Sequence, residues 1–230
     1  MSALQNAVKV AAELLSEGRY AEFGRRTAAL TYERRISYGL RRDLRIPIKH
    51  PKAKIPISVR EMRESDLPAM FDSKVTLHRR EQVELHARKS HYEAKIPRCY
   101  VAIDERNGTP CYFQWLMGPQ ENAKIQALFP PGWFPTLKAD EALLENAYTP
   151  VAYRGNGIMS AAMALIAEEA DALGCRYVIT FVERDNIPSL KGCHNAGFLP
   201  YLVRNEKRYL ANNIIRRSFS PYTGPPQPVR

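Results

Sequence analysis

The chain is poor in cysteine and lacks long apolar runs, and both features restrict its class. Four cysteines occur in 230 residues, without metal-ligand spacing and without a dense disulfide pattern. No apolar run approaches the ~18 residues that a membrane-spanning helix needs, and the N-terminus lacks the charged-then-apolar layout of a signal peptide. We therefore expect a globular protein in the cytoplasm with reduced thiols. Its length allows one sizeable domain and an extension, or two small domains.

The histidines give little support for a metal centre. His78, His86 and His91 fall in a helical stretch predicted for residues 75–92, but their spacings do not put all three on one helix face. We interpret them as surface residues and expect no metal site.

Acidic residues are scarce in the first part of the chain. Residues 1–63 hold 14 Lys and Arg against 6 Asp and Glu, whereas the rest holds 20 against 18. Arginine pairs alternate with aromatic residues from Arg19 to Arg45, a stretch that we predict to be helical. Two interpretations stay open: a basic surface in residues 19–54 for an anionic membrane face or an acidic partner, or an arm that packs on its own domain or on a sister subunit of a homodimer. We do not expect nucleic acid as the partner.

Prolines at positions 47, 51 and 56 mark a linker after this basic stretch. We expect residues 1–54 to form a basic helical extension with its linker and residues 55–220 to form the main domain. Residues 221–230 are rich in proline and should form a flexible tail.

Residues 143–182 predict a βαβ unit. An apolar strand over 143–149 precedes a turn with two glycines, Gly155 and Gly157, and an amphipathic helix leads to a second strand over 177–182. The glycines permit positive φ and a close approach of the backbone to a ligand. The free N–H groups that open the helix attract an anion such as a pyrophosphate, and Arg154 adds a positive charge.

Two further strands and an unusual loop precede this unit. Residues 99–103 and 111–116 read as strands, with Asn107-Gly108 as a hairpin turn between them. Residues 118–140 are rich in proline and aromatic residues and are long for a connector. This segment forms either a wall of a substrate pocket or a packed surface loop.

Two motifs in this region resemble those of the GNAT acyltransferase superfamily. The turn reads Arg154-Gly155-Asn156-Gly157-Ile158-Met159, which is similar to the GNAT pyrophosphate loop Arg/Gln-x-x-Gly-x-Gly/Ala. The stretch from Asn186 to Phe198 resembles a second GNAT pattern, Asn-x-x-Ser-x-x-Leu-Tyr-x-x-x-Gly-Phe, with Asn186, Ser189, Gly197 and Phe198 in register. Three positions depart from the patterns: Met159 replaces a small residue, and Gly192 and Cys193 replace Leu and Tyr. From Met159 we expect looser or shifted helix packing near the loop.

The resemblance implies a fold and a donor. The fold is of the α+β class (three-layer α/β), with a mixed, mostly antiparallel twisted sheet flanked by helices. The activity is N-acyl transfer, expected to be acetyl transfer, from acetyl-CoA or another acyl-CoA as co-substrate to an amine acceptor by direct attack in a ternary complex. The donor-binding residues that it implies are Tyr148, Thr149, Val151, Arg154, Gly155, Asn156, Gly157, Ile158, Met159, Asn186 and Ser189.

The catalytic residues are less constrained by the resemblance. Glu145 is the candidate base, because a partly buried carboxylate in this strand could have a raised pKa; it could equally be a solvent-facing strand residue. The family often uses the missing Tyr as the acid, so Cys193, His194, Tyr148 and Tyr201 are the candidates, although Cys193 could be a packing residue.

Two other functions stay open beside the acyltransferase. One is a GNAT-fold binding or scaffold protein that has lost catalysis, which the missing Tyr and Met159 suggest. The other is a long-chain N-acyltransferase that residues 19–54 hold at the inner face of a membrane.

Overall fold

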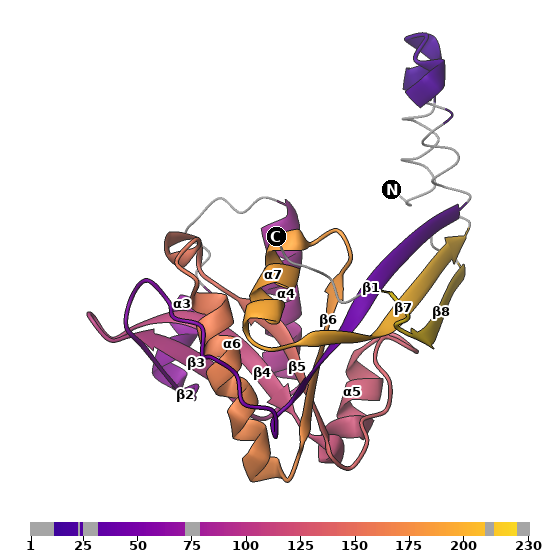
Figure 1. Ribbon diagram of the computed structural model, residues 1–230. Coiled ribbons are helices and arrows are strands. Elements are labelled where there is room, and N and C mark those ends of the chain that lie inside the picture. The colour runs from indigo at the N-terminus through magenta and orange to yellow at the C-terminus, as the bar shows by residue number, and fades with distance from the viewer. Residues whose placement is uncertain (1–11, 23, 25–31, 72–78, 210–213, 225–230) are drawn as a thin grey trace.

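The computed structural model describes residues 12–22, 24, 32–71, 79–209 and 214–224, and these contain one eight-stranded sheet. The strand order is β2-β3-β4-β5-β6-β1-β7-β8, and every neighbouring pair is antiparallel except the parallel pair β5–β6. The strands are β1 (Tyr32–Asp43), β2 (Ile57–Glu61), β3 (Cys99–Asp104), β4 (Thr109–Met117), β5 (Glu141–Tyr148), β6 (Tyr177–Glu183), β7 (Leu199–Tyr209) and β8 (Ile214–Pro221). The predicted mixed, mostly antiparallel sheet is confirmed (Figure 1).

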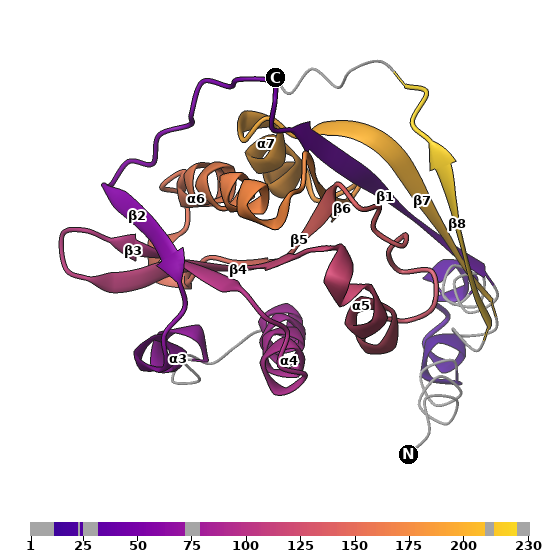
Figure 2. The same ribbon diagram turned by 90° about the horizontal axis from the view of Figure 1, so that it is seen from below.

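Helices cover both faces of the sheet and make three layers (Figure 2). On one face lie α3 (Leu67–Met70), α4 (Arg79–Glu93) and α5 (Asn122–Leu128), and on the other lie α6 (Ile158–Glu168) and α7 (Ile187–Asn195). Short 3₁₀ turns are η1 (Glu64–Asp66), η2 (Pro119–Glu121), η3 (Val151–Tyr153) and η4 (Glu169–Leu173). Each face has its own apolar core: Leu144, Ile158 and Met163 belong to the first core, beneath α6, and Trp115, Ile125 and Ile179 belong to the second. Among the described residues, no helix has the length and apolar character that a membrane crossing requires.

The predicted βαβ unit is confirmed as β5, α6 and β6. β5 and β6 pair in parallel from Glu141–Tyr177 to Leu143–Ile179. Gly174, with φ of 72°, ends η4 in the left-handed region as a C-terminal cap. The hairpin at Asn107-Gly108 is also confirmed, because it joins the antiparallel strands β3 and β4.

The helix predicted to continue to Arg45 is wrong for residues 32–43, which form β1 inside the sheet. β1 pairs with β6 on one side and with β7 on the other. Its even residues Tyr38, Leu40 and Arg42 face the first core, where the Arg42 guanidinium donates to the carbonyl of Ala164 at 2.8 Å. The arginines obscured this period-two pattern, since a long side chain can bury its stem and keep its charge paired.

The residues after β1 are also part of the packed structure. Leu44, Ile48, Ala53 and Ile55 pack against the first core, and the segment that contains them runs beside α6 to β2 (Figure 2). The expected boundary near residue 54 therefore does not divide the sheet or this core. Residues 12–16 and 20–22 are helical, and residues 1–11 and 25–31 lie outside the described part of the chain.

We predicted a flexible tail from residue 221, but the ordered structure extends beyond that residue. Pro221 ends β8, the Tyr222 backbone N–H donates to the Tyr201 carbonyl at 3.0 Å, and the Tyr222 ring packs edge-on against Tyr38. Residues 225–230 of the predicted tail lie outside the described residues.

Candidate functional site

The glycine turn forms the start of α6 as the sequence predicts. Gly155 and Gly157 have φ of 79° and 70°, a region that costs an L-residue about 1–2 kcal/mol. Gly157 is the N-cap of α6, so the N–H groups of Ile158 and Met159 have no partner within the helix. The Asn156 side chain donates to the carbonyl of Tyr153 at 3.1 Å and closes the turn. The turn therefore presents backbone donors and the positive end of a helix dipole to an anion.

A cleft of about 980 Å³ opens in front of this turn. Nine of the eleven predicted donor residues line it: Tyr148, Thr149, Arg154, Gly155, Gly157, Ile158, Met159, Asn186 and Ser189. Val151 and Asn156 do not: Val151 lies in η3 with half of its surface exposed, and the Asn156 side chain holds the turn instead. The structure thus brings together residues from β5, the turn, α6 and the start of α7.

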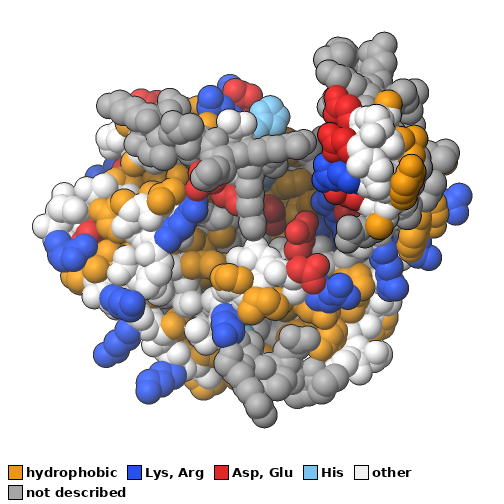
Figure 3. Space-filling model, turned by 90° about the horizontal axis from the view of Figure 1, so that it is seen from above, with side chains coloured by type: hydrophobic (Ala, Val, Ile, Leu, Met, Phe, Trp, Pro, Cys, Tyr) orange, Lys and Arg blue, Asp and Glu red, His pale blue; other side chains and the backbone are white. Residues whose placement is uncertain are grey.

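Two carboxylates in the cleft were missed by the sequence analysis. Glu81 and Glu84 of α4 line it, and Glu81 accepts a hydrogen bond from the Arg154 guanidinium at 3.0 Å. Arg154 also donates to the carbonyl of Thr149 at 3.1 Å. The face seen from above is hollowed, and acidic side chains stand beside Lys and Arg around the hollow (Figure 3). No local pattern could pair Glu81 with Arg154, because 73 positions separate them.

The second motif holds α7 against the cleft. The Asn186 side chain accepts from the Ser189 backbone N–H at 3.4 Å and caps the helix. Asn186 therefore has a structural role at the helix start, and its position in the cleft also allows contact with a donor.

Two departures from the GNAT patterns compensate each other. A Cβ on Gly192 would stand 3.1 Å from the Met159 sulfur and 3.6 Å from the Ser160 hydroxyl. Met159 therefore fills the space that a side chain at position 192 would need, and α6 and α7 remain in contact. The expected loosening of the helix packing does not occur at this contact, and the alternative of shifted helices stays a prediction.

β5 separates from β6 beside the cleft. Their pairing ends at Leu143–Ile179, and the register of β5 against β4 shifts between Phe113 and Trp115. Asn146 lies in this irregular part with φ of 58°, a left-handed conformation that few non-glycine residues adopt. The edge of β5 that faces β6 is therefore unpaired beyond Leu143 among the described strands, and its backbone is available to a ligand.

Glu145 stands at this separation, on the face covered by α4 and α5. It lies opposite Trp115 in β4 and is partly buried. Burial raises the pKa of Glu145 to about 7, while the charge of Arg204 and the Asn146 backbone N–H act in the opposite direction. A carboxylate with this pKa suits proton transfer near neutral pH, so its environment fits the predicted base better than the solvent-facing alternative.

The segment over residues 118–140 packs beside Glu145. Arg204 of β7 donates to the Trp133 carbonyl at 2.7 Å and to the Ser37 hydroxyl at 2.9 Å, and its guanidinium stacks on the Trp133 ring. Phe134 is buried and packs edge-on against Phe181 of β6. The segment is therefore not the loop that we expected: residues 119–128 form η2 and α5, the remainder packs on the sheet, and through Arg204 it also shapes the surroundings of Glu145.

The acid candidates separate clearly by position. Cys193 is 1% exposed in the first core, with its sulfur 3.7 Å from that of Met163, and burial raises its pKa to about 12. Its place in the core contradicts the catalytic role that we allowed for it and favours the packing role. Tyr201 lies under the Arg41 guanidinium and lines a separate cavity, so its position also contradicts a role in this cleft. His194 is exposed outside the cleft lining, and of the four candidates only Tyr148 lines the cleft.

His91 is not the surface residue that we predicted. It is 3% exposed, its Nδ1 lies 2.8 Å from the Ala87 carbonyl and 3.2 Å from the Asn146 amide nitrogen, and burial lowers its pKa. It thus supports the irregular part of β5 from α4. His86 is exposed as predicted, and His78 lies outside the described residues. In the described part of the chain, no three His, Cys, Asp or Glu side chains are grouped closely enough to hold a metal ion.

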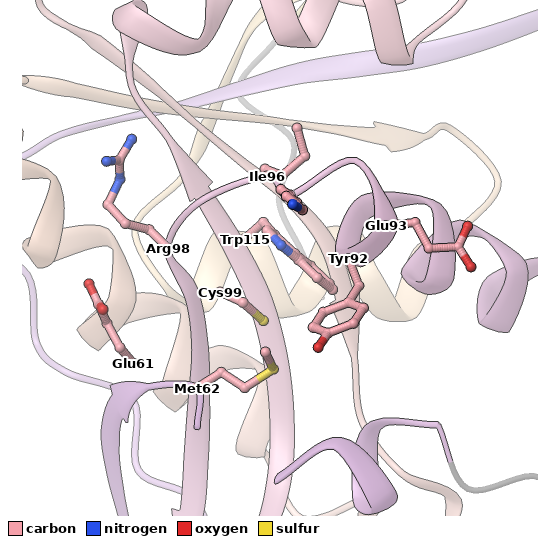
Figure 4. Close-up of a pocket in the computed structure, with 9 residues that line it drawn as sticks. Glu61, Met62, Tyr92, Glu93, Ile96, Arg98, Cys99 and Trp115 are labelled. Carbon is pink, nitrogen blue, oxygen red and sulfur yellow. The ribbon is translucent and has the colours of Figure 1, made fainter. Parts of the chain in front are cut away.

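A second cavity lies at the other end of α4. Met62, Tyr92, Cys99 and Trp115 converge on it, whereas the charged ends of Glu61, Glu93 and Arg98 point away from its centre (Figure 4). It contains none of the predicted donor or catalytic residues. The cleft at the glycine turn is therefore the better candidate for the functional site.

Comparison with known proteins agrees with this geometry. Residues 77–198 match the model of the acetyltransferase (GNAT) family, which is more than half of the chain. The chain belongs to the GNAT family. No curated protein matches it.

Solved structures share the fold at low sequence identity. A GCN5-related N-acetyltransferase from Sphaerobacter thermophilus superposes with a TM-score of 0.50 and 13% identity, over 81% of this chain and 55% of that chain. The glucosamine N-acetyltransferase region of a fungal multi-domain GH3 β-N-acetylglucosaminidase gives a TM-score of 0.53 and 14% identity, over 83% of this chain and 22% of that chain. The chain thus spans about half the length of the bacterial protein and less than a quarter of the fungal one.

Proposed function

We propose that this protein is an acyl-CoA-dependent N-acyltransferase, with acetyl-CoA as the donor and an amine as the acceptor. One observation carries the proposal: the anion-binding turn at Gly155–Gly157 opens on the same cleft as the unpaired end of β5, and Glu145 stands in that strand. A donor that joins a pyrophosphate to a thioester through a long arm matches such a site. Family membership supports the same reaction class.

The donor is held by charge and by backbone donors. The N–H groups at the start of α6 and the Arg154 guanidinium bind the pyrophosphate. The unpaired edge of β5 near Thr149 binds the amide-containing arm as a neighbouring strand would. The thioester then lies at the separation between β5 and β6, beside Glu145.

Acyl transfer follows by direct attack. The Glu145 carboxylate takes a proton from the acceptor ammonium, and the neutral amine attacks the thioester carbonyl carbon. Backbone N–H groups of β5 stabilise the oxyanion of the tetrahedral intermediate. The carbon–sulfur bond then breaks as the Tyr148 hydroxyl protonates the leaving thiolate. The nitrogen gives up its second proton, which returns to the Tyr148 phenolate through solvent and leaves a neutral amide.

Calorimetric titration with acetyl-CoA tests the proposal. We expect micromolar binding by the wild-type protein and roughly thirtyfold weaker binding by Arg154→Glu, because the substitution replaces an attraction of ~1 kcal/mol with a repulsion of similar size, a change of ~2 kcal/mol. Arg216→Glu on the exposed edge strand β8 is the matched control and should bind as the wild type does. Absence of acetyl-CoA binding by the wild type would contradict the proposed function, and equal affinities for Arg154→Glu and wild type would contradict the donor placement.

Binding is followed by an assay of turnover. Release of free thiol from acetyl-CoA in the presence of a panel of amines measures transfer. A parallel titration with a long-chain acyl-CoA tests the membrane-associated alternative, which predicts that the longer donor binds more tightly than acetyl-CoA.

A further inference from the structure

A strap formed by residues 50–56 lies against the glycine turn. The Lys54 backbone N–H donates to the Asn156 carbonyl at 2.9 Å. A Cβ on Gly157 would stand 3.4 Å from the Lys52 carbonyl oxygen, so the strap crosses the turn at close range. Ala53 and Ile55 pack on the first core. The strap is therefore held in place by backbone and apolar contacts, and it touches the turn that opens on the cleft.

The two lysines of the strap point away from the core. Residues alternate along the strap, with Ala53 and Ile55 partly buried and Lys52 and Lys54 exposed. No ion pair within the described part of the chain involves either lysine. The Lys54 backbone N–H and the Lys52 carbonyl both contact the turn, so both side chains start from backbone beside it.

Both lysines line a cavity of about 330 Å³ between the strap and α6. Its other walls are mainly apolar, with Ile55 on the strap side and Ala161 and Leu165 on the helix side. Among the described residues that line it none is acidic, and His50 at its edge faces Glu168 at 3.2 Å. Apolar walls with two ammonium groups suit a ligand that combines a flat heterocycle with a phosphate.

We propose that the strap is the outer wall of the donor site and that Lys52 and Lys54 bind the 3′-phosphate of coenzyme A. This inference rests on the proposed function. The strap touches the turn at Asn156 and Gly157, so a ribose attached to a pyrophosphate at the turn would lie within reach of its lysines. Because Gly157 has no side chain, the strap can lie close enough for its lysines to reach that ribose. Two of the 14 Lys and Arg residues in positions 1–63 thereby bind the donor.

The test compares coenzyme A with dephospho-coenzyme A, which lacks only the 3′-phosphate. Calorimetric titration of the full-length wild type should show about tenfold tighter binding of coenzyme A, the size expected for two solvent-exposed charge pairs. The double variant Lys52→Gln/Lys54→Gln should bind both ligands equally, at the wild-type affinity for dephospho-coenzyme A. The matched control Lys49→Gln/Lys207→Gln removes two exposed lysines outside this cavity and should keep the preference.

The outcomes separate this proposal from the function on which it rests. Equal binding of both ligands by the wild type, or a preference that survives in the double variant, would overturn the role of the strap while the protein still binds the donor. A wild type that binds neither ligand would overturn the proposed function and this inference together. Thermal unfolding of each variant checks that the exposed substitutions leave the fold intact.

Discussion

Replacing Glu145 with Gln should make the protein less active and, at alkaline pH, more stable. The carboxyl is partly buried, and its pKa is raised from 4.5 to about 7. The wild-type protein must therefore hold an ionised carboxylate in a poorly solvated place whenever the pH exceeds this pKa. Gln has nearly the same shape as the protonated acid and carries no charge.

The size and the sign of the effect follow from the linkage between protonation and folding. Below about pH 4.5 the carboxyl is protonated in the folded and the unfolded protein, and the variant should match the wild type. As the pH rises to about 7 only the unfolded protein releases this proton, so the wild type loses stability relative to the variant. The pKa difference corresponds to roughly 3 kcal/mol. Because the side chain is only partly buried, we take this as an upper limit and expect about 1–2 kcal/mol.

Urea denaturation at pH 4.5 and at pH 8.5 measures this difference. We expect a higher denaturation midpoint for Glu145→Gln at pH 8.5 and equal midpoints at pH 4.5, together with a loss of turnover of roughly 10²–10⁴-fold. Glu183→Gln, at the exposed end of β6, controls for the loss of one negative charge. A variant that is less stable than the wild type at pH 8.5, or a difference that does not change with pH, would refute the reasoning.

Three further variants test other parts of the structure. Glu81→Gln removes the ion pair with Arg154 and a negative charge from the cleft. Acetyl-CoA should therefore bind about fivefold more tightly, which corresponds to ~1 kcal/mol. The control Glu64→Gln, at an exposed residue of η1, should leave the affinity for acetyl-CoA unchanged. Gly192→Leu should lower the free energy of unfolding by about 1–3 kcal/mol because it overlaps Met159, and Met159→Ala in the same chain should recover most of that loss. Removal of residues 1–43 should prevent folding, since β6 and β7 would lose the strand between them; a native circular dichroism spectrum of the truncated protein would contradict this.

The local features of the site could be read from the amino-acid order. Gly155 and Gly157 adopt positive φ because only glycine does so without cost, and α6 begins there. The apolar periods of 143–149 and 177–182 predicted adjacent parallel strands, because a helix of this length returns the chain to the same sheet. Nine of the eleven predicted donor residues line one cleft, because the elements that carry them (β5, the glycine turn, α6 and the start of α7) follow one another closely in the chain.

Other properties depend on contacts between residues that are far apart in the chain. Arg42 reaches Ala164 across 122 positions, and such pairings turned residues 32–43 of the arginine-rich stretch that we predicted as a helix into the interior strand β1. The core around Cys193 buries its thiol, and the contact between Met159 and Gly192 offsets two changes that looked independent. Local propensity is worth a fraction of a kcal/mol per residue, whereas burial and pairing in a sheet contribute more. The sequence by itself therefore determined the glycine turn and its helix, and only the tertiary structure decided which distant side chains surround them.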